Sequence, residues 1–126
     1  MKWASSLILF FTLSSCFFSK GNAPEAKKLR HIVAFKYKPE VTPEQMEKIT
    51  THFRSLKAEI PQIIDFEGGA DIALEKKKGK YTHCFVVTVK NEKDLATYGA
   101  HPAHKAFSKS VDPLLAEVMV VDYWTE

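Results

Sequence analysis

The sequence holds five histidines, and histidine is the side chain whose ordinary pKa suits it best to proton transfer near neutral pH. His31 and His83 each stand in a run in which apolar or aromatic residues occupy every second position. In a strand, each imidazole would therefore face an apolar interior. A histidine buried there is most often a structural hydrogen-bonding residue. Two of them on one cavity would instead supply polar groups to a small-molecule site.

A metal site is the other chemistry that the histidine spacing suggests. His101 and His104 are separated by three positions, which on one helix would place both side chains on the same side. Pro102 makes His101 part of the turn before the helix, so the two imidazoles need not converge. No carboxylate or cysteine completes a ligand set by local spacing. We therefore expect no metal, and no haem or flavin, since no motif for either cofactor is present.

Alternating β-branched and aromatic residues predict the strands that would position these groups. The predicted strands cover residues 29–38, 63–67, 81–90 and 117–123. The second strand is expected to stop at Gly68 and Gly69.

Capping residues predict the helices. Thr42 as N-cap, Pro43 and Gln45 form a capping box that opens a helix over 43–60. A second helical region covers 91–111, with a new start at Pro102.

The resulting order, βαββαβ, is the ferredoxin-like α+β pattern, an antiparallel four-stranded sheet with its helices on one face. The first, third and fourth strands nevertheless carry apolar or aromatic residues on both faces. The uncovered face must therefore meet something, such as a second copy of the chain or a ligand.

The N-terminal segment has the pattern of an export signal. Lys2 is followed by the apolar stretch Trp3–Leu13. A membrane span is the weaker interpretation, because the stretch is interrupted by serine and threonine and is short of the roughly 20 apolar residues that a span requires. Leu13-Ser14-Ser15-Cys16 resembles the lipobox of bacterial lipoproteins. We expect a signal peptide over 1–15, lipidation of Cys16, a tether over 16–28 and a domain over 29–126. The alternatives are plain secretion, to the periplasm or outside, and an uncleaved anchor.

Composition limits the remaining possibilities. The chain has 126 residues, of which 45% are apolar and 12% aromatic, which suits one folded domain and excludes a disordered chain. A net charge of +3 is too small to indicate nucleic acid. With only two cysteines a disulfide scaffold is excluded, and we expect Cys84 to be a small buried apolar residue rather than a reactive thiol.

Five short segments carry a resemblance to a known family. They are Arg30-His31-Ile32-Val33, Thr42-Pro43-Glu44-Gln45, Tyr81-Thr82-His83, His101-Pro102-Ala103-His104 and Val120-Val121-Asp122-Tyr123. The His-Pro-Ala-His segment is the most specific of them. On these residues, the region 29–124 resembles the stress-responsive dimeric α/β-barrel (Dabb) domain, most members of which have no assigned reaction.

The resemblance implies a homodimer whose two sheets close into a barrel, with a cavity between sheet and helices in each subunit. In a cofactor-free cyclase of this family, which closes a linear polyketide by aldol condensation, the catalytic tyrosine and histidine correspond to Tyr98 and His104. Two further pocket histidines correspond to His31 and His83. The pocket wall corresponds to Val33, Phe35, Ile49, Phe53, Phe85, Phe107, Leu115, Val118 and Val120.

The sequence departs from that cyclase in the pocket wall. Ile49 and Leu115 replace large aromatic residues, Phe53 lacks the hydroxyl of a tyrosine, and Ser108 replaces a glycine. The changed pocket argues against the same substrate.

We therefore expect an exported homodimer that binds a small apolar or aromatic molecule, touching the membrane only through its lipid anchor. The ligand-binding residues would be His31, Val33, Phe35, Phe53, His83, Phe85 and Phe107. The alternative is a cofactor-free aldol cyclase or isomerase. In such an enzyme, His104 would take a proton next to a carbonyl group and the Tyr98 hydroxyl would stabilise the enolate.

Overall fold

The computed structural model describes residues 25–73 and 80–126. The predicted signal peptide, Cys16 and most of the predicted tether lie outside the described residues. The elements, in chain order, are β1 (Leu29–Tyr37), α1 (Pro43–Glu59), β2 (Asp65–Ala70), β3 (His83–Val89), α2 (Glu92–Ala100), α3 (Pro102–Val111), a 3-10 turn (Asp112–Leu114) and β4 (Leu115–Trp124). None of the helices in the described ranges is long and apolar enough to cross a membrane.

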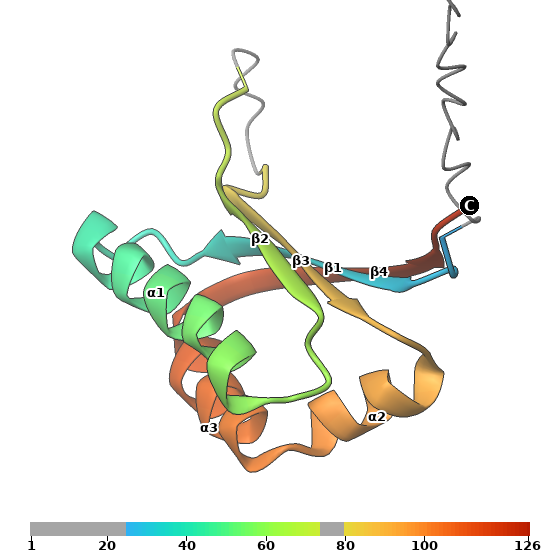
Figure 1. Cartoon of the computed structure of the whole chain (residues 1–126). Helices are drawn as coiled ribbons and strands as arrows, with labels where there is room; N and C mark the ends of the chain where they lie inside the picture. The colour runs from blue at the N-terminus through green and yellow to red at the C-terminus, as the bar shows by residue number, and fades with distance from the viewer. Residues whose placement is uncertain (1–24, 74–79) are drawn as a thin grey trace, which may run out of the picture.

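The four strands form one antiparallel sheet in the order β2-β3-β1-β4. All three helices lie on one side of this sheet (Figure 1). This is the ferredoxin-like α+β fold that the sequence predicts. The predicted second helical region forms two helices, because Pro102 starts a new helix at the turn.

Local signals explain the helix ends. At the start of α1, the Gln45 amide donates to the Thr42 hydroxyl over 3.3 Å and the Thr42 amide donates to the Gln45 side chain over 2.9 Å. Asn91 caps α2 by accepting from the Asp94 amide. Pro113 lies in the 3-10 turn that follows α3, because a residue without an amide hydrogen cannot make the next helical hydrogen bond.

The predicted end of β2 was wrong. The strand begins at Asp65 and runs through both glycines to Ala70, pairing with β3 throughout. Gly68 has a φ of 131°, a left-handed conformation, and a Cβ at this position would collide with the carbonyl oxygen of Cys84. The glycine therefore does not stop the strand but allows it to lie close against β3.

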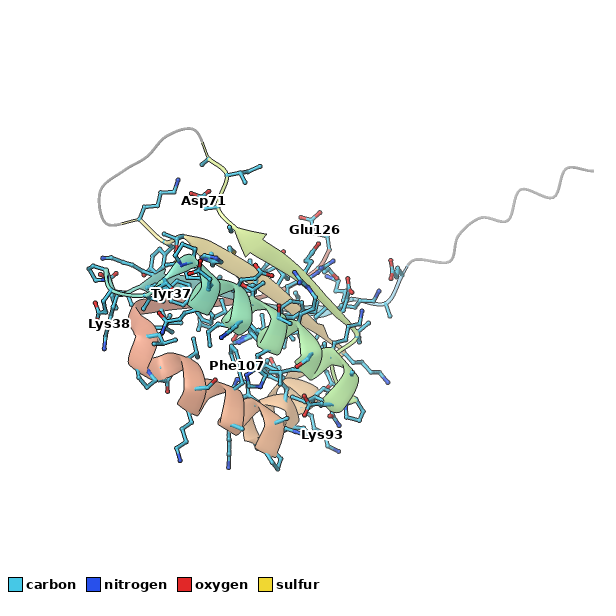
Figure 2. The ribbon with its side chains drawn as sticks, turned by 90° about the vertical axis from the view of Figure 1, so that its left-hand side faces the viewer. Tyr37, Lys38, Asp71, Lys93, Phe107 and Glu126 are labelled. Carbon is cyan, nitrogen blue, oxygen red and sulfur yellow. The ribbon has the colours of Figure 1, made fainter. Side chains whose placement is uncertain are left out.

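The core lies between the sheet and the helices and is rich in phenylalanine. The Phe53 ring on α1 stacks on Phe107 of α3 at 4.5 Å between centroids, and it contacts Phe85 of β3 at 5.1 Å. Figure 2 places Phe107 between α3 and α1. These ring contacts pack the helices against the sheet, next to the site described below.

The edge strand β4 remains exposed on both faces. Val118 and Val120, on the side of the helices, are 54% and 50% exposed, and Met119 and Val121 on the other side are 41% and 46% exposed. Cys84 is also exposed in the single chain, on the face without helices. Its predicted burial was therefore wrong at the level of one subunit, because no described element of the same chain covers that face.

Candidate functional site

A pocket of about 240 Å³ opens between the β1–β4 half of the sheet and helices α2 and α3. Most of its wall is apolar, and its polar groups come from several elements. The lining residues are His31, Val33, Phe35, Phe53, Tyr98, His104, Phe107, Ser108, Val111, Asp112, Leu115, Val118 and Val120.

Tyr98 and His104 meet across the turn between α2 and α3. Their ring centroids are 4.4 Å apart. The turn is fixed by His101, whose Nδ1 accepts a hydrogen bond from the Ala103 amide at the start of α3. The short connection therefore places a phenol from one helix beside an imidazole from the next, at the same side of the pocket.

The protonation state of His104 follows from its surroundings. Its Nδ1 lies 3.1 Å from the Gly99 carbonyl oxygen, which can only accept, so Nδ1 carries the hydrogen. Burial lowers the pKa of His104 below its ordinary value of 6.5, so the imidazole is neutral at neutral pH. Its Nε2 is then an unprotonated acceptor, the form that a general base needs.

The Tyr98 hydroxyl is buried and lacks a hydrogen-bond partner. The residue is 2% exposed, and no described group bonds to its Oη. Burial raises the pKa of this phenol well above its ordinary value of 10, so the group keeps its proton. An unpaired buried hydroxyl costs roughly 1–3 kcal/mol, which a ligand oxygen in the pocket would offset.

His31 contributes a second imidazole from β1. It lies edge-on to Tyr98, with ring centroids 5.7 Å apart. On its other side, Nδ1 is 2.6 Å from Oδ1 of Asp122, which is the residue directly opposite on β4. The sequence analysis placed Asp122 in the predicted strand 117–123 but missed its contact with His31, because that contact depends on which strands are neighbours.

The structure brings together most of the predicted pocket residues. His31, Tyr98, His104 and the predicted wall residues Val33, Phe35, Phe53, Phe107, Leu115, Val118 and Val120 line one cavity. The sequence reasoning did not single out Val111 and Asp112 as lining residues.

Three predicted residues do not line this pocket. Ile49 and Phe85 are buried in the core. His83 shares the helix-covered sheet face but lies beside Tyr37, at 5.2 Å between ring centroids, and its Nδ1 is 3.1 Å from the Thr82 hydroxyl. Burial lowers the pKa of His83, and the nearby Glu47 carboxylate partly opposes this shift.

The geometry also bears on the alternative of metal binding. His101 and His104 direct their Nδ1 atoms to different backbone groups, the Ala103 amide and the Gly99 carbonyl. Across residues 25–73 and 80–126, no group of three or more His, Cys, Asp or Glu side chains is arranged to hold a metal ion.

Comparisons with known proteins agree with this architecture. The family model described as the stress responsive A/B barrel domain (Dabb) matches residues 29–125. The stress-response A/B barrel domain-containing protein HS1 of Arabidopsis thaliana is 33% identical over 79% of this chain and 92% of its own length. Olivetolic acid cyclase of Cannabis sativa is 28% identical over 75% of this chain and 94% of its own length. Among solved structures, a dimeric ferredoxin-like protein from Thermobifida fusca is 31% identical, with a TM-score of 0.70 over 80% of this chain and 93% of that chain.

Proposed function

Because the chain belongs to the family of stress-responsive A/B barrel domains (Dabb), we propose that it is a homodimer that binds a small apolar or aromatic molecule in the pocket of each subunit. The single observation that carries this proposal is the Tyr98 hydroxyl, buried and unpaired in the wall of an apolar cavity. Of the five buried side-chain atoms without a hydrogen-bond partner in the described residues, only Tyr98 Oη belongs to a residue that lines the pocket. A ligand, or its water, in the pocket would supply the missing partner.

The size and lining of the pocket support a ring-containing ligand. A volume of about 240 Å³ exceeds that of an engineered apolar cavity of about 150 Å³ that binds benzene. Phenylalanine and valine side chains would contact the body of the ligand, while Tyr98, His104 and His31 would contact a polar group.

The exposed apolar surface of β4 supports the homodimer. Several solved relatives are dimeric proteins of the same fold. Val118 and Val120 line the pocket yet are half exposed, while Met119 and Val121 extend the apolar surface onto the face without helices. A second copy seated on this surface would bury it and enclose the pocket further, which is the usual meaning of a large exposed apolar patch.

Filling the pocket tests the ligand proposal. Ser108 lines the cavity, whereas the next residue on α3, Lys109, is exposed and does not. We expect Ser108→Trp to abolish binding of 4-butylphenol, measured by calorimetry, while the matched control Lys109→Trp keeps the wild-type affinity. Equal binding by both variants would place the ligand elsewhere and contradict the proposal.

A second candidate function, cofactor-free proton transfer, is favoured by the tautomer of His104. Its free Nε2 can take a proton from the carbon next to a ligand carbonyl, while the Tyr98 hydroxyl donates to the developing enolate oxygen. The resulting imidazolium returns a solvent-exchanged hydrogen to the same carbon. We expect the wild type to accelerate deuterium exchange into 4-phenyl-2-butanone in heavy water, and His104→Gln to remove that acceleration while still binding the ketone. No acceleration by the wild type would leave binding as the function.

We further propose that the chain is exported and lipid-modified at Cys16, on the basis of the Leu13-Ser14-Ser15-Cys16 motif behind an apolar stretch. Expression of the full chain in a bacterium fed a radiolabelled fatty acid tests this. We expect the wild type to be labelled in the membrane fraction and Cys16→Ser to lose the label. An unlabelled wild type in the culture medium or the periplasm would indicate plain secretion.

A further inference from the structure

The proposed pocket contains two imidazoles and a phenol, and the partners of these groups decide which hydrogen bonds a ligand can form. A neutral imidazole carries one hydrogen, on Nδ1 or on Nε2, and the other nitrogen accepts. A partner fixed on one nitrogen therefore determines whether the other nitrogen donates or accepts.

At His31 the partner is Asp122. Oδ1 of this carboxylate is 2.6 Å from Nδ1, and an ionised carboxylate can only accept, so Nδ1 carries the hydrogen. The two residues are directly opposite in the β1–β4 register, which fixes the geometry through the backbone. The His31 side chain is 15% exposed and that of Asp122, on the edge strand β4, is 42% exposed, so the imidazole is largely buried while its carboxylate partner reaches solvent.

At His104 the partner is the Gly99 carbonyl, which imposes the same tautomer. No other hydrogen bond to either imidazole is seen in residues 25–73 and 80–126. Both histidines line the pocket. With a neutral His31, the site thus offers two imidazole acceptors and two hydroxyls that can donate, those of Tyr98 and Ser108.

We propose that Asp122 is a specificity-determining residue: by holding the hydrogen of His31 on Nδ1, it makes the pocket select neutral ligands that carry a hydroxyl group, such as phenols and enols. A hydroxyl can donate to an imidazole Nε2 and accept from Tyr98 at once. An ether or ketone accepts only, so it pairs with neither imidazole nitrogen, whereas a hydroxyl pairs with one of the two. A carboxylate also accepts only, and it would bring a negative charge close to that of Asp122. This inference rests on the proposed ligand pocket and names the chemical class of its ligand.

A matched pair of probes tests the preference. 4-Butylphenol and its methyl ether, 4-butylanisole, share one body and differ in the donating hydrogen. We expect the wild type to bind the phenol about tenfold more tightly, the usual effect of one buried hydrogen bond. In Asp122→Asn the side-chain amide can donate to Nδ1, which moves the hydrogen of His31 to Nε2, as the equivalent change does in serine proteases. The preference for the phenol should then fall at least about threefold, because one acceptor has become a donor.

Two further measurements make the outcome specific. Glu117→Gln removes the same charge from β4 at a residue paired with Lys36, away from the pocket, and should keep the wild-type preference. Nitrogen-15 NMR shifts of the His31 ring report its tautomer directly and should show the hydrogen on Nδ1 in the wild type and on Nε2 in Asp122→Asn.

Three results would overturn the inference. They are equal binding of the two probes by the wild type, an unchanged preference in Asp122→Asn, and a wild-type His31 ring protonated on both nitrogens. Binding of neither probe to the wild type overturns the proposed pocket, and the inference falls with it.

Discussion

The ring of Tyr98 on α2 lies 4.4 Å from that of His104 on α3, and the phenol has no partner for its buried hydroxyl among the described residues. The backbone carbonyl of Gly99, the residue after this tyrosine, fixes the tautomer of His104. One turn between two helices therefore places a donor and an acceptor side by side in an apolar cavity. This arrangement suits the recognition of one polar atom on an apolar ligand, and the same two groups would serve proton transfer.

Removal of the Tyr98 hydroxyl should make the protein more stable and lower its affinity for the ligand. We expect Tyr98→Phe to raise the free energy of unfolding in urea by up to about 1 kcal/mol, because an unpaired buried hydroxyl is lost. The affinity for 4-butylphenol should fall about threefold to tenfold, because the ligand oxygen loses a donor. A variant that is less stable than the wild type would mean that the hydroxyl is already satisfied within the protein, and would contradict a role reserved for a ligand.

The two glycines of β2 should respond differently to a methyl group. At Gly68 a Cβ would collide with the backbone of β3, and the φ of 131° is strained for any other residue, so Gly68→Ala should destabilise the protein by about 2 kcal/mol or more. At Gly69 nothing lies within 4 Å of the position that a Cβ would take, so Gly69→Ala should change stability by less than about 1 kcal/mol. Thermal unfolding of both variants checks this. Similar losses in both would disprove the close approach of β2 to β3.

Stability should fall in mild acid. Burial holds the pKa of His83 and of His104 below 6.5 in the folded state, whereas both histidines have their ordinary pKa in the unfolded chain. At pH values between the lowered and the ordinary pKa, the unfolded chain therefore binds more protons than the folded chain. The contribution of the two neutral histidines to the free energy of unfolding is fully present above their unfolded pKa of 6.5. It is lost progressively as the pH falls from there toward the lowered pKa values of the folded state. Urea unfolding at about pH 7.5 and about pH 5.5 should show this loss, and replacing both histidines with glutamine should reduce it. Stability that is unchanged or greater at the lower pH would contradict the two pKa shifts.

A charge on the uncovered face of the sheet should separate the proposed dimer. Val121 is 46% exposed on that face, and Val121→Asp should halve the mass measured by analytical ultracentrifugation, because an unpaired buried carboxylate is costly. Cys84 lies on the same face and should react faster with a thiol reagent once the dimer is lost. Ile72→Asp is the matched control, because Ile72 is 93% exposed and lies outside the sheet. A Val121→Asp protein that is still dimeric would place the interface elsewhere.

The parts of the fold that could be predicted are those with local causes. The start of α1 follows from the capping box of Thr42 and Gln45, which involves residues three positions apart. The faces of β1 follow from alternation, and His31 lies on the predicted side. The path of β2 through Gly68 could not be predicted, because it depends on how closely β3 approaches.

Only part of the candidate site could be predicted, because strand alternation is a local pattern and strand pairing is not. Alternation places His31 and His83 on one face of the sheet, but it does not say how far apart they lie along and across the strands. In the structure, His31 lines the pocket and His83 packs against Tyr37 instead. The contact between His31 and Asp122 joins residues that are 91 positions apart, and only the pairing of β1 with β4 brings them together.

The central claim is that this pocket binds a small aromatic ligand with its polar group at Tyr98 and His104. The measurement that tests it most directly is an isotope-filtered NOE experiment on the wild-type protein with 4-butylphenol. We predict contacts from the probe's ring hydrogens to Tyr98 and His104, and from its butyl chain to the valine and phenylalanine side chains of the pocket. Contacts confined to other surfaces, such as the face of the sheet that carries Val121, or no contacts at all in the presence of excess probe, would contradict the account.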